Sequence, residues 1–395
     1  MERSAIFPKS RFQEFFDLMQ EFGDVFAPRR VSEKSFSFKQ VKNPSEIAFE
    51  ALRTILPPKK FFFQQRETII SYDENGVRET KPKVSPQVLF GLHPCDLAGL
   101  GIMDKVYSAS PPDPHYMARR QATLLVGLSC MPDKHCFCKA MGTDSPTSDY
   151  DLFLTDIGED YFVQIHTPIG LQMVGSKKEL FSGSDETKSQ AFKDFWTTRD
   201  QAFTSHFQSE NLPAIMDMEW DNKVWDELGN RCLSCGNCTP VCPTCYCFDM
   251  VDVASLHAQA GERVREWDSC QFVGFAKVAG DTNFRPGPVD RLKFWYRHKL
   301  HGFEDPHGLP TCVGCGRCTE SCPAGIDDIV SVVLRLQGKP SVLISDRTTG
   351  ATNSDCCGSD GGCGSGCGGC GSTHGSTSGG SPGCGGTDTG GHPHA

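Results

Sequence analysis

Hydrophobic residues in the first half of the chain recur in two patterns. Apolar side chains from Phe12 to Phe22 fall at helical spacing, which predicts an amphipathic helix over residues 11–22 whose apolar stripe packs on a core. Residues 88–92 and 123–128 are short, continuous apolar runs, which are typical of strands buried on both faces in a parallel sheet. The two patterns together predict a sheet covered by helices.

Two further elements complete this part of the chain. Residues 151–155 and 161–167 are expected to form a hairpin across Gly158, Glu159 and Asp160. Residues 191–207 are expected to form a helix that leads to the next domain. We therefore predict a mixed α/β domain over residues 1–215.

The composition changes sharply over residues 346–395, which are mostly Gly, Ser, Thr and Cys with almost no apolar side chains. Such a segment cannot bury enough surface to offset the entropy lost on ordering, so we expect a disordered, low-complexity tail. The tail also carries six cysteines, so metal binding stays open as an alternative: Cys356, Cys357, Cys363, Cys367, Cys370 and Cys384.

The chain has 21 cysteines, too many for packing alone, and eight of them form two copies of one motif. Both copies follow C-x2-C-x2-C-x3-C-P: Cys232, Cys235, Cys238 and Cys242 in the first, and Cys312, Cys315, Cys318 and Cys322 in the second. Three thiolates two residues apart can hold one [4Fe–4S] cluster, while the fourth points away and ligates the other cluster. We therefore predict one cluster on Cys232, Cys235, Cys238 and Cys322, and a second on Cys312, Cys315, Cys318 and Cys242.

Structural zinc sites are the main alternative for these eight cysteines. Paired zinc sites would use C-x2-C pairs, which leaves the third cysteine of each triplet and the following Pro243 or Pro323 unexplained. Gly236, Gly314 and Gly316 also suit a cluster, since glycine lets the backbone approach inorganic sulfides closely.

Five further segments, together with the eight cysteines, make about residues 85–335 similar to a known protein family. They are residues 93–97 (His-Pro-Cys-Asp-Leu), 136–138 (Cys-Phe-Cys), 242–247 (Cys-Pro-Thr-Cys-Tyr-Cys), 267–270 (Trp-Asp-Ser-Cys) and 297–300 (Arg-His-Lys-Leu). The chain resembles the iron–sulfur (beta) subunits of cytoplasmic NAD(P)-linked [NiFe] hydrogenases, the sulfhydrogenases. It is equally similar to the A subunit of anaerobic sulfite reductase.

The resemblance implies a subunit that relays electrons and is not itself catalytic. Its expected partners are a flavin- and NAD(P)-binding subunit and a catalytic subunit, either the hydrogenase small and large subunits or sulfite reductase. The Gly/Cys-rich tail is not part of the family pattern.

Four more cysteines fall near the predicted sheet. Cys95 follows the strand ending at Leu92, and Cys130 follows the strand ending at Leu128, so both are expected at the carboxyl edge of one parallel sheet. Cys136 and Cys138 come from the loop after Cys130. Convergence of the four thiols predicts a third metal site, for which zinc is an alternative, as are four unrelated buried thiols. The resemblance favours a third [4Fe–4S] cluster.

Cys245, Cys247 and Cys270 remain, in the insert between the two motifs. Three thiols cannot close a four-thiolate site, so they pack in the core, support the cluster environment, or supply a ligand in place of one assigned above. A basic run lies in the same insert: Arg285, Arg291, Arg297, His298 and Lys299. Cations near an anionic cluster raise its reduction potential, but a solvated basic face is the interpretation we favour for this run.

Other features exclude several classes of function. The net charge of −10 argues against a nucleic-acid partner. The sequence has no export signal and no apolar window of the ~20 residues that span a bilayer, so we expect a cytoplasmic protein with no membrane span. It has no P-loop, and no Gly-x-Gly-x-x-Gly follows a predicted strand, so it is not expected to bind nucleotide or flavin itself. His115 and His135 are expected to be surface or structural residues.

The sequence thus predicts an α+β chain in three parts. A mixed α/β domain with a third cluster covers residues 1–215, a helical, ferredoxin-like domain with two [4Fe–4S] clusters covers residues 216–345, and the tail covers residues 346–395. The predicted function is electron transfer within an oxidoreductase complex. Two alternatives stay open: a catalytic N-terminal cluster with an open iron, and clusters that serve only as structural staples.

Overall fold

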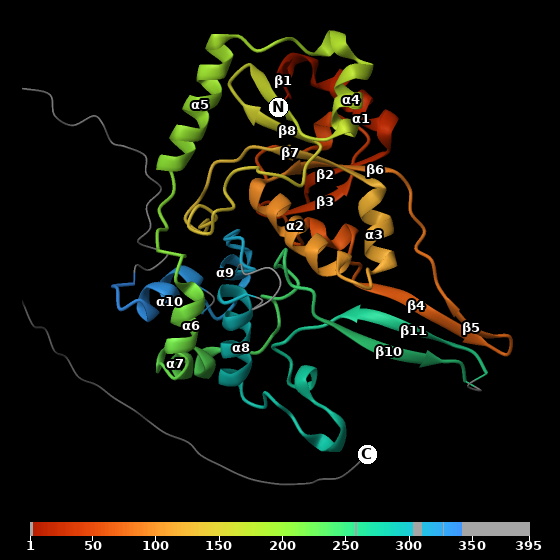
Figure 1. Cartoon of the computed structure of the whole chain (residues 1–395), viewed down its shortest axis with the longest axis vertical. Helices are drawn as coiled ribbons and strands as arrows, with labels where there is room; N and C mark the ends of the chain where they lie inside the picture. The colour runs from red at the N-terminus through yellow and green to blue at the C-terminus, as the bar shows by residue number, and fades with distance from the viewer. Residues whose placement is uncertain (1–2, 257–258, 303–309, 327, 342–395) are drawn as a thin grey trace, which may run out of the picture. The chain divides into compact units, whose positions relative to one another are not determined.

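A seven-stranded mixed sheet organises the N-terminal half of the chain in the computed structural model, which describes residues 3–256, 259–302, 310–326 and 328–341 (Figure 1). The strand order is β1-β9-β8-β7-β6-β2-β3, with β2, β6, β7 and β8 parallel and the outer pairs antiparallel. The strands are β1 (Arg3–Pro8), β2 (Asp24–Arg30), β3 (Phe36–Gln40), β6 (Gln87–Leu92), β7 (Thr123–Leu128), β8 (Leu152–Asp156) and β9 (Asp160–Ile165).

Helices cover both faces of this sheet, because successive side chains of a strand point to opposite sides. Val88 and Phe90 of β6 pack in one core with α1 (Phe12–Phe22). Leu89, between them, packs in a second core with α2 (Pro94–Ser108) and α3 (Pro114–Gln121). The chain therefore has a three-layer arrangement here, with α1 and α2 on opposite faces (Figure 1).

Most of the elements predicted for this half are confirmed. The first helix, the two parallel strands and the hairpin lie where the apolar patterns put them. The helix predicted over residues 191–207 is displaced, since α5 spans Glu186–Gln201. The helix begins early because the Asp185 side chain accepts a hydrogen bond from the Lys188 N–H and caps it. It also ends early, and Phe203 is buried beside Cys136 and Cys138.

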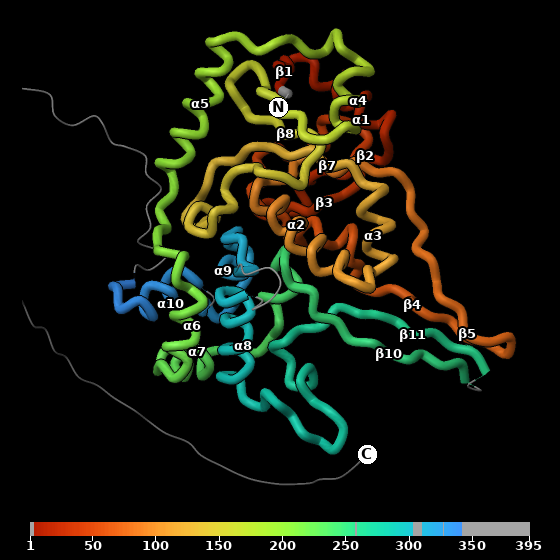
Figure 2. Tube along the Cα trace, viewed as in Figure 1, coloured from red at the N-terminus to blue at the C-terminus, as the bar shows by residue number. Residues whose placement is uncertain are grey.

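A second sheet joins segments that lie far apart in the sequence, and the sequence patterns did not predict it. Its order is β10-β11-β4-β5, and all neighbours are antiparallel. The strands are β4 (Arg66–Asp73), β5 (Gly76–Glu79), β10 (Phe248–Ala254) and β11 (Gly261–Trp267). We had expected residues 216–345 to form a helical domain. That expectation is wrong in part, because these residues contribute two strands, β10 and β11, to the second sheet. Figure 2 traces the two hairpins, which lie side by side.

The remaining helices surround the two cysteine motifs. They are α6 (Leu212–Met218), α7 (Val224–Arg231), α8 (Pro288–Leu300), α9 (Arg317–Ser321) and α10 (Ile329–Leu336); α4 (Pro168–Ser176) lies earlier, by the first sheet. None of the helices in the described ranges is long and apolar enough to cross a membrane. The tail predicted over residues 346–395 lies outside the described residues, and the domain boundary near residue 215 stays a prediction.

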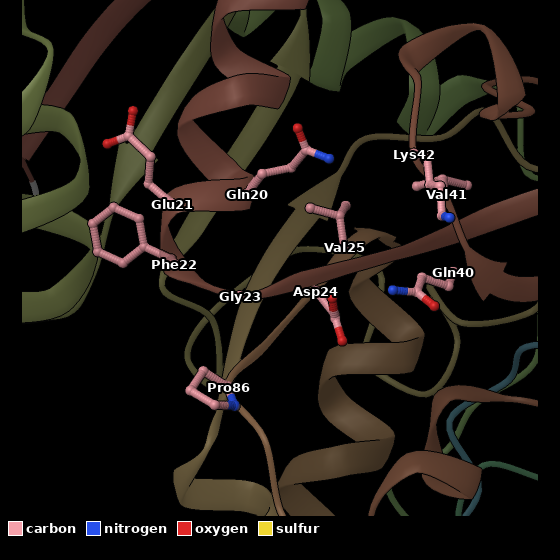
Figure 3. Close-up of a pocket in the computed structure, with 10 residues that line it drawn as sticks. All are labelled: Gln20, Glu21, Phe22, Gly23, Asp24, Val25, Gln40, Val41, Lys42 and Pro86. Carbon is pink, nitrogen blue, oxygen red and sulfur yellow. The ribbon is translucent and has the colours of Figure 1, made fainter.

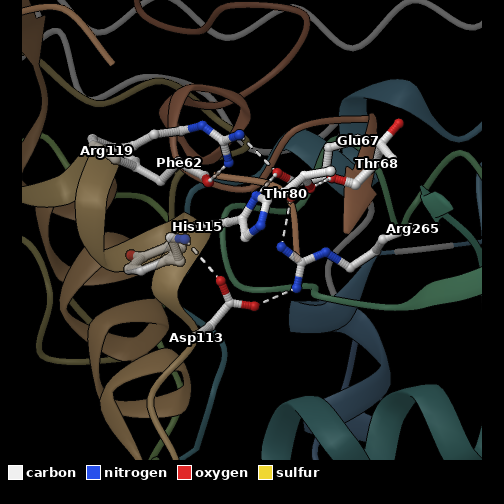
Figure 4. Close-up of polar contacts among 9 residues, drawn as sticks. Phe62, Glu67, Thr68, Thr80, Asp113, His115, Arg119 and Arg265 are labelled. Carbon is white, nitrogen blue, oxygen red and sulfur yellow. Dashed lines mark hydrogen bonds and ion pairs between the residues drawn. The ribbon is translucent and has the colours of Figure 1, made fainter. Parts of the chain in front are cut away.

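A buried ionic network ties the second sheet to α3 (Figure 4). Glu67 of β4 accepts hydrogen bonds from Arg119 of α3 at 2.7 Å and from Arg265 of β11 at 2.5 Å. The Nδ1 atom of His115 lies 3.0 Å from the same carboxylate. Arg265 also pairs with Asp113, which caps α3 by accepting a hydrogen bond from the Tyr116 N–H. His115 therefore has the structural role that the sequence suggested.

Replacing Glu67 tests this network. Glu67→Gln removes the charge shared by two buried arginines, so we expect a loss of about 3 kcal/mol in the free energy of unfolding at neutral pH. Burial opposes ionisation of Glu67, but the hydrogen bonds from Arg119 and Arg265 lower its pKa below 4.5. Its contribution is thus complete above pH 4.5, and the difference from wild type should vanish as the pH falls through the lowered pKa.

Anaerobic chemical denaturation at several pH values measures this effect. Glu79→Gln, on the exposed strand β5, is the matched control and should change stability by no more than about 0.5 kcal/mol. Equal effects of the two substitutions would show that the network does not stabilise the junction.

Candidate iron–sulfur sites

The first cysteine motif begins where α7 ends and wraps around a small cavity. Ser234 and Gly236 adopt positive φ angles of 50° and 78°, which turn the backbone tightly between the cysteines. The Ser234 N–H donates to the sulfur of Cys232 at 3.4 Å. Four cysteines line this cavity: Cys232, Cys235, Cys238 and Cys322.

The second motif lies around a separate small cavity. Cys312, Cys315 and Cys318 are buried, and the Gly314 N–H donates to the sulfur of Cys312 at 3.5 Å. Burial raises the pKa of the Cys312 thiol to about 12. Four cysteines line this cavity: Cys242, Cys312, Cys315 and Cys318. Each cavity is thus lined by three cysteines of one motif and the fourth cysteine of the other, the same sets of four that the spacing assigns to the clusters, whose role as ligands stays a prediction.

Gly314 and Gly316 bring the second motif against the loop that carries Cys136 and Cys138. Both glycines have positive φ, 63° and 75°. A Cβ on Gly314 would lie 2.5 Å from the backbone nitrogen of Cys138, and one on Gly316 would lie 2.4 Å from the carbonyl oxygen of His135. The Phe137 N–H donates to the Gly314 carbonyl at 2.9 Å, which fixes the two loops together.

The four cysteines of the predicted third site come together at the edge of the first sheet. Cys95 lies in the first turn of α2 directly after β6, and Cys130 follows β7. Cys136 and Cys138 are buried in a small cluster with Phe203, against which Cys95 packs. Cys130 interacts electrostatically with both Cys136 and Cys138.

Two arginines contact this third group of thiols. Arg53 donates to the sulfur of Cys136 at 3.2 Å and to the carbonyl of Cys315 at 2.8 Å, so it bridges the third group and the second motif. Arg199 donates to the carbonyl of Cys130 at 2.7 Å. Both are charge-paired, Arg53 with Asp133 and Arg199 with Asp144. No motif or spacing in the sequence pointed to either arginine.

His93 adds a third cation beside Cys130. Its Nδ1 lies 3.0 Å from the Leu128 carbonyl oxygen and its Nε2 lies 3.0 Å from the Ala51 carbonyl oxygen. Because carbonyl oxygens only accept hydrogen bonds, both ring nitrogens must carry a proton. Burial opposes this charge, but the neighbouring Cys130 thiol raises the pKa of His93 to about 9.

Two buried lysines, Lys59 and Lys299, lie near the second cavity. Lys299 lines that cavity and donates to the Thr244 hydroxyl at 3.0 Å. Burial opposes its charge, but the thiols of Cys242 and Cys245 raise its pKa well above the ordinary value. Burial lowers the pKa of Lys59 to about 8. Lys299 and Arg291, which we had assigned to a solvated basic face, are 1% and 3% exposed, so that interpretation is wrong for both residues.

The three leftover cysteines lie in pairs with other thiols. Cys245 is buried and hydrogen-bonded to Cys242, which lines the second cavity. Cys270 is buried and donates a hydrogen bond to Cys247, whose pKa it lowers to about 7. Neither pair completes a set of four thiols outside the three groups described above.

The donor chemistry of the two cavities fits iron–sulfur clusters. Four thiols around one cavity offer one thiolate to each iron of a [4Fe–4S] cluster. Within the described ranges, no group of three or more His, Cys, Asp or Glu side chains is arranged around a single metal ion, so the four cysteines of each cavity do not form a mononuclear site. A more open hollow, between the end of α1 and the starts of β2 and β6, is lined without cysteine or histidine and therefore lacks such ligands (Figure 3).

Comparison with known proteins defines the class. Residues 231–326, which contain both motifs, match the family model of a 4Fe-4S dicluster domain. This match indicates two [4Fe–4S] clusters and, with them, an iron–sulfur protein of electron transport. No solved structure matches the chain.

A curated relative extends the match over most of the sequence. The chain is 40% identical over 318 residues to sulfhydrogenase 2 subunit beta of Pyrococcus furiosus, covering 80% of this chain and 94% of the relative. The chain therefore belongs to the family of sulfhydrogenase beta subunits, which confirms the resemblance read from its motifs.

Cross-pairing of the motifs can be tested by counting iron. Cys242→Ala should remove about four irons, the content of one cubane, and should destroy the site shared with Cys312. The double variant Cys242→Ala/Cys312→Ala should then lose no more iron than Cys242→Ala alone. The control pair Cys242→Ala/Cys232→Ala should lose about eight irons. If Cys232→Ala adds nothing while Cys312→Ala does, the cross-pairing is wrong.

Proposed function

We propose that this chain is the electron-relay subunit of an oxidoreductase complex, between an NAD(P)H-linked flavoprotein subunit and a catalytic subunit such as a [NiFe] hydrogenase. The observation that carries the proposal is that each of two cavities is lined by four cysteines drawn from both motifs. The similarity to a sulfhydrogenase beta subunit supports a hydrogenase complex with other subunits. When bound, a [4Fe–4S] cluster supplies reversible one-electron chemistry.

Three ligand sets follow from this proposal. The first is Cys232, Cys235, Cys238 and Cys322; the second is Cys312, Cys315, Cys318 and Cys242; the third is Cys95, Cys130, Cys136 and Cys138. The third set is supported by the convergence of its thiols and by the cations Arg53, Arg199 and His93 around them, which compensate thiolate charge. All four ligands of the third set are cysteines, which argues against a catalytic iron with an open position.

The contacts between the sites support the order first, second, third along the relay. Cys238 and Cys242, both from the first motif, belong to the first and second sites, so only three residues of chain separate a ligand of one site from a ligand of the other. Arg53 and the hydrogen bond from Phe137 to Gly314 link the second and third sites. A buried ion pair of 2.8 Å between Arg317 and Asp96, the neighbours of Cys318 and Cys95, adds a further link.

The chain's own residues would then hold the clusters in a dry, hydrogen-bonded shell. Burial of the second set excludes water, while Cys235 of the first set is exposed. This difference favours the first site as the place where electrons enter or leave at the surface, because electron transfer needs a short path between centres. Backbone N–H groups at Ser234 and Gly314 donate to ligand sulfurs, which tunes reduction potential.

The rest of the proposal follows the family. A cytoplasmic complex fits the cytoplasmic hydrogenases that the sequence resembles, and anaerobic sulfite reductase is the alternative catalytic partner. The division into a domain over residues 1–215 and a ferredoxin-like domain over residues 216–345 is proposed on the two groups of cysteines.

Metal content tests the three sets. Anaerobically prepared protein should contain about twelve irons per chain, four for each cubane. Cys138→Ala should lower this to about eight and leave the spectra of the other two clusters unchanged. About eight irons with one bound zinc in the wild-type protein would contradict a third cluster and leave the paired motifs standing.

Capture from native extract tests the partners. The full chain, carrying an affinity tag, should co-purify with a flavoprotein and a catalytic subunit, identified by mass. NAD(P)H should reduce the clusters in this complex but not in the isolated chain, which has no nucleotide-binding motif. Clusters that cannot be reduced reversibly in either sample would favour structural staples and contradict the relay.

A further inference from the structure

Lys299 lies against the second cysteine site from α8. Its side chain is 1% exposed and lines the same cavity as Cys242 and Cys312. Its Nζ donates to the Thr244 hydroxyl at 3.0 Å, and that hydroxyl lies 3.3 Å from the sulfur of Cys242. The ammonium group is thus held beside the ligands of one site by a short polar chain.

Lys59 reaches the same region from the N-terminal half, from the short helix Pro58–Phe61. It is also 1% exposed. Its Nζ donates to the carbonyls of Thr239 at 3.1 Å and Cys245 at 2.7 Å, and lies 4.6 Å from the centre of the Trp267 ring. These carbonyls flank Cys242 in the chain, so both lysines surround the segment that crosses from the first site to the second.

Neither lysine is paired with a carboxylate among the described residues, and this separates them from the arginines near the cysteines. Arg53 pairs with Asp133, Arg199 with Asp144, and Arg317 with Asp96. Arg291 is also buried without a carboxylate, but it binds Ser234, beside the first site. A buried cation without a counter-ion is costly, so Lys59 and Lys299 require an anion nearby.

The anion that fits is the thiolate-ligated centre itself. Four thiolates give a [4Fe–4S] site a net negative charge, and each added electron makes it more negative. We propose that Lys299 and Lys59 are the counter-ions of the second site and that they raise its reduction potential. This inference rests on the proposed relay, in which the two lysines would make the second site a better electron acceptor.

Redox titration followed by electron paramagnetic resonance tests the proposal. The signal of the second site is identified as the one that Cys242→Ala abolishes. Lys299→Met and Lys59→Met keep much of the apolar stem and remove the charge. Each should lower the ratio of reduced to oxidised second site at a fixed potential at least ten-fold, which is about 59 mV for a one-electron couple. The double variant should shift the midpoint further.

Two controls separate charge from shape and position. Lys299→Arg keeps the charge, so the midpoint potential of its second site should lie close to that of the wild-type protein. Lys277→Met removes an exposed lysine of the same insert, which pairs with exposed Asp281, and should leave every midpoint unchanged because solvent screens it.

Three results would overturn the proposal. The first is an unchanged midpoint in lysine variants that retain their iron, and the second is an equal shift in Lys277→Met. If Lys299→Met loses iron and Lys59→Met does not, the midpoint of Lys59→Met decides the test. Lys59 contacts backbone carbonyls and does not line the cavity, so its replacement need not disturb the site. The third result is loss of iron in both variants, which would make the lysines part of site assembly. Failure of the relay itself is distinct, because the wild-type clusters would then not titrate reversibly.

Discussion

The loop over residues 135–138 lies directly on the backbone of Gly314 and Gly316, and most of the proposed relay depends on this contact. Any side chain at either glycine would meet backbone atoms within 2.6 Å, and both glycines have positive φ angles. The third group of cysteines therefore cannot shift relative to the second without breaking main-chain contacts. Backbone sterics therefore limit the separation of these two sites, in addition to the side-chain links made by Arg53 and by the Arg317–Asp96 ion pair.

Charge is the second constraint on the cysteine-rich region. Two kinds of buried cation there differ in their partners: arginines paired with carboxylates cross-link the loops, and lysines without carboxylates face thiols. The first kind holds the loops together whether or not a metal is bound. The second kind is stable only when an anionic group is close, so the protein and its cofactors are expected to depend on each other for stability.

Local sequence patterns predicted those parts of the structure that depend on neighbouring residues, namely the buried strands and the grouping of the motif cysteines. The strands β6 and β7 are buried on both faces, so their apolar runs were clear, and the cysteine spacing predicted which four thiols line each cavity. The second sheet had no such buried run, because β10 and β5 are exposed along almost their whole length and the apolar residues of β10 are divided between its two faces. Asn75-Gly76, a common hairpin turn, was the one local clue to β4 and β5. Lys59 is one of two adjacent lysines, and only tertiary packing buries it.

The pairing of β4 with β11 also has a consequence for the order in which the protein is made. Glu67 leaves the ribosome almost two hundred residues before Arg265, its partner in the buried network. During that interval the edge of β4 that later pairs with β11 is unpaired. Unpaired strand edges can pair wrongly with other chains. The first cavity is complete only after Cys322 and the second only after Cys318. Complete cluster sites therefore form only after residues 318 and 322 have been synthesised, and a chaperone that covers the open edge would protect the nascent chain until then.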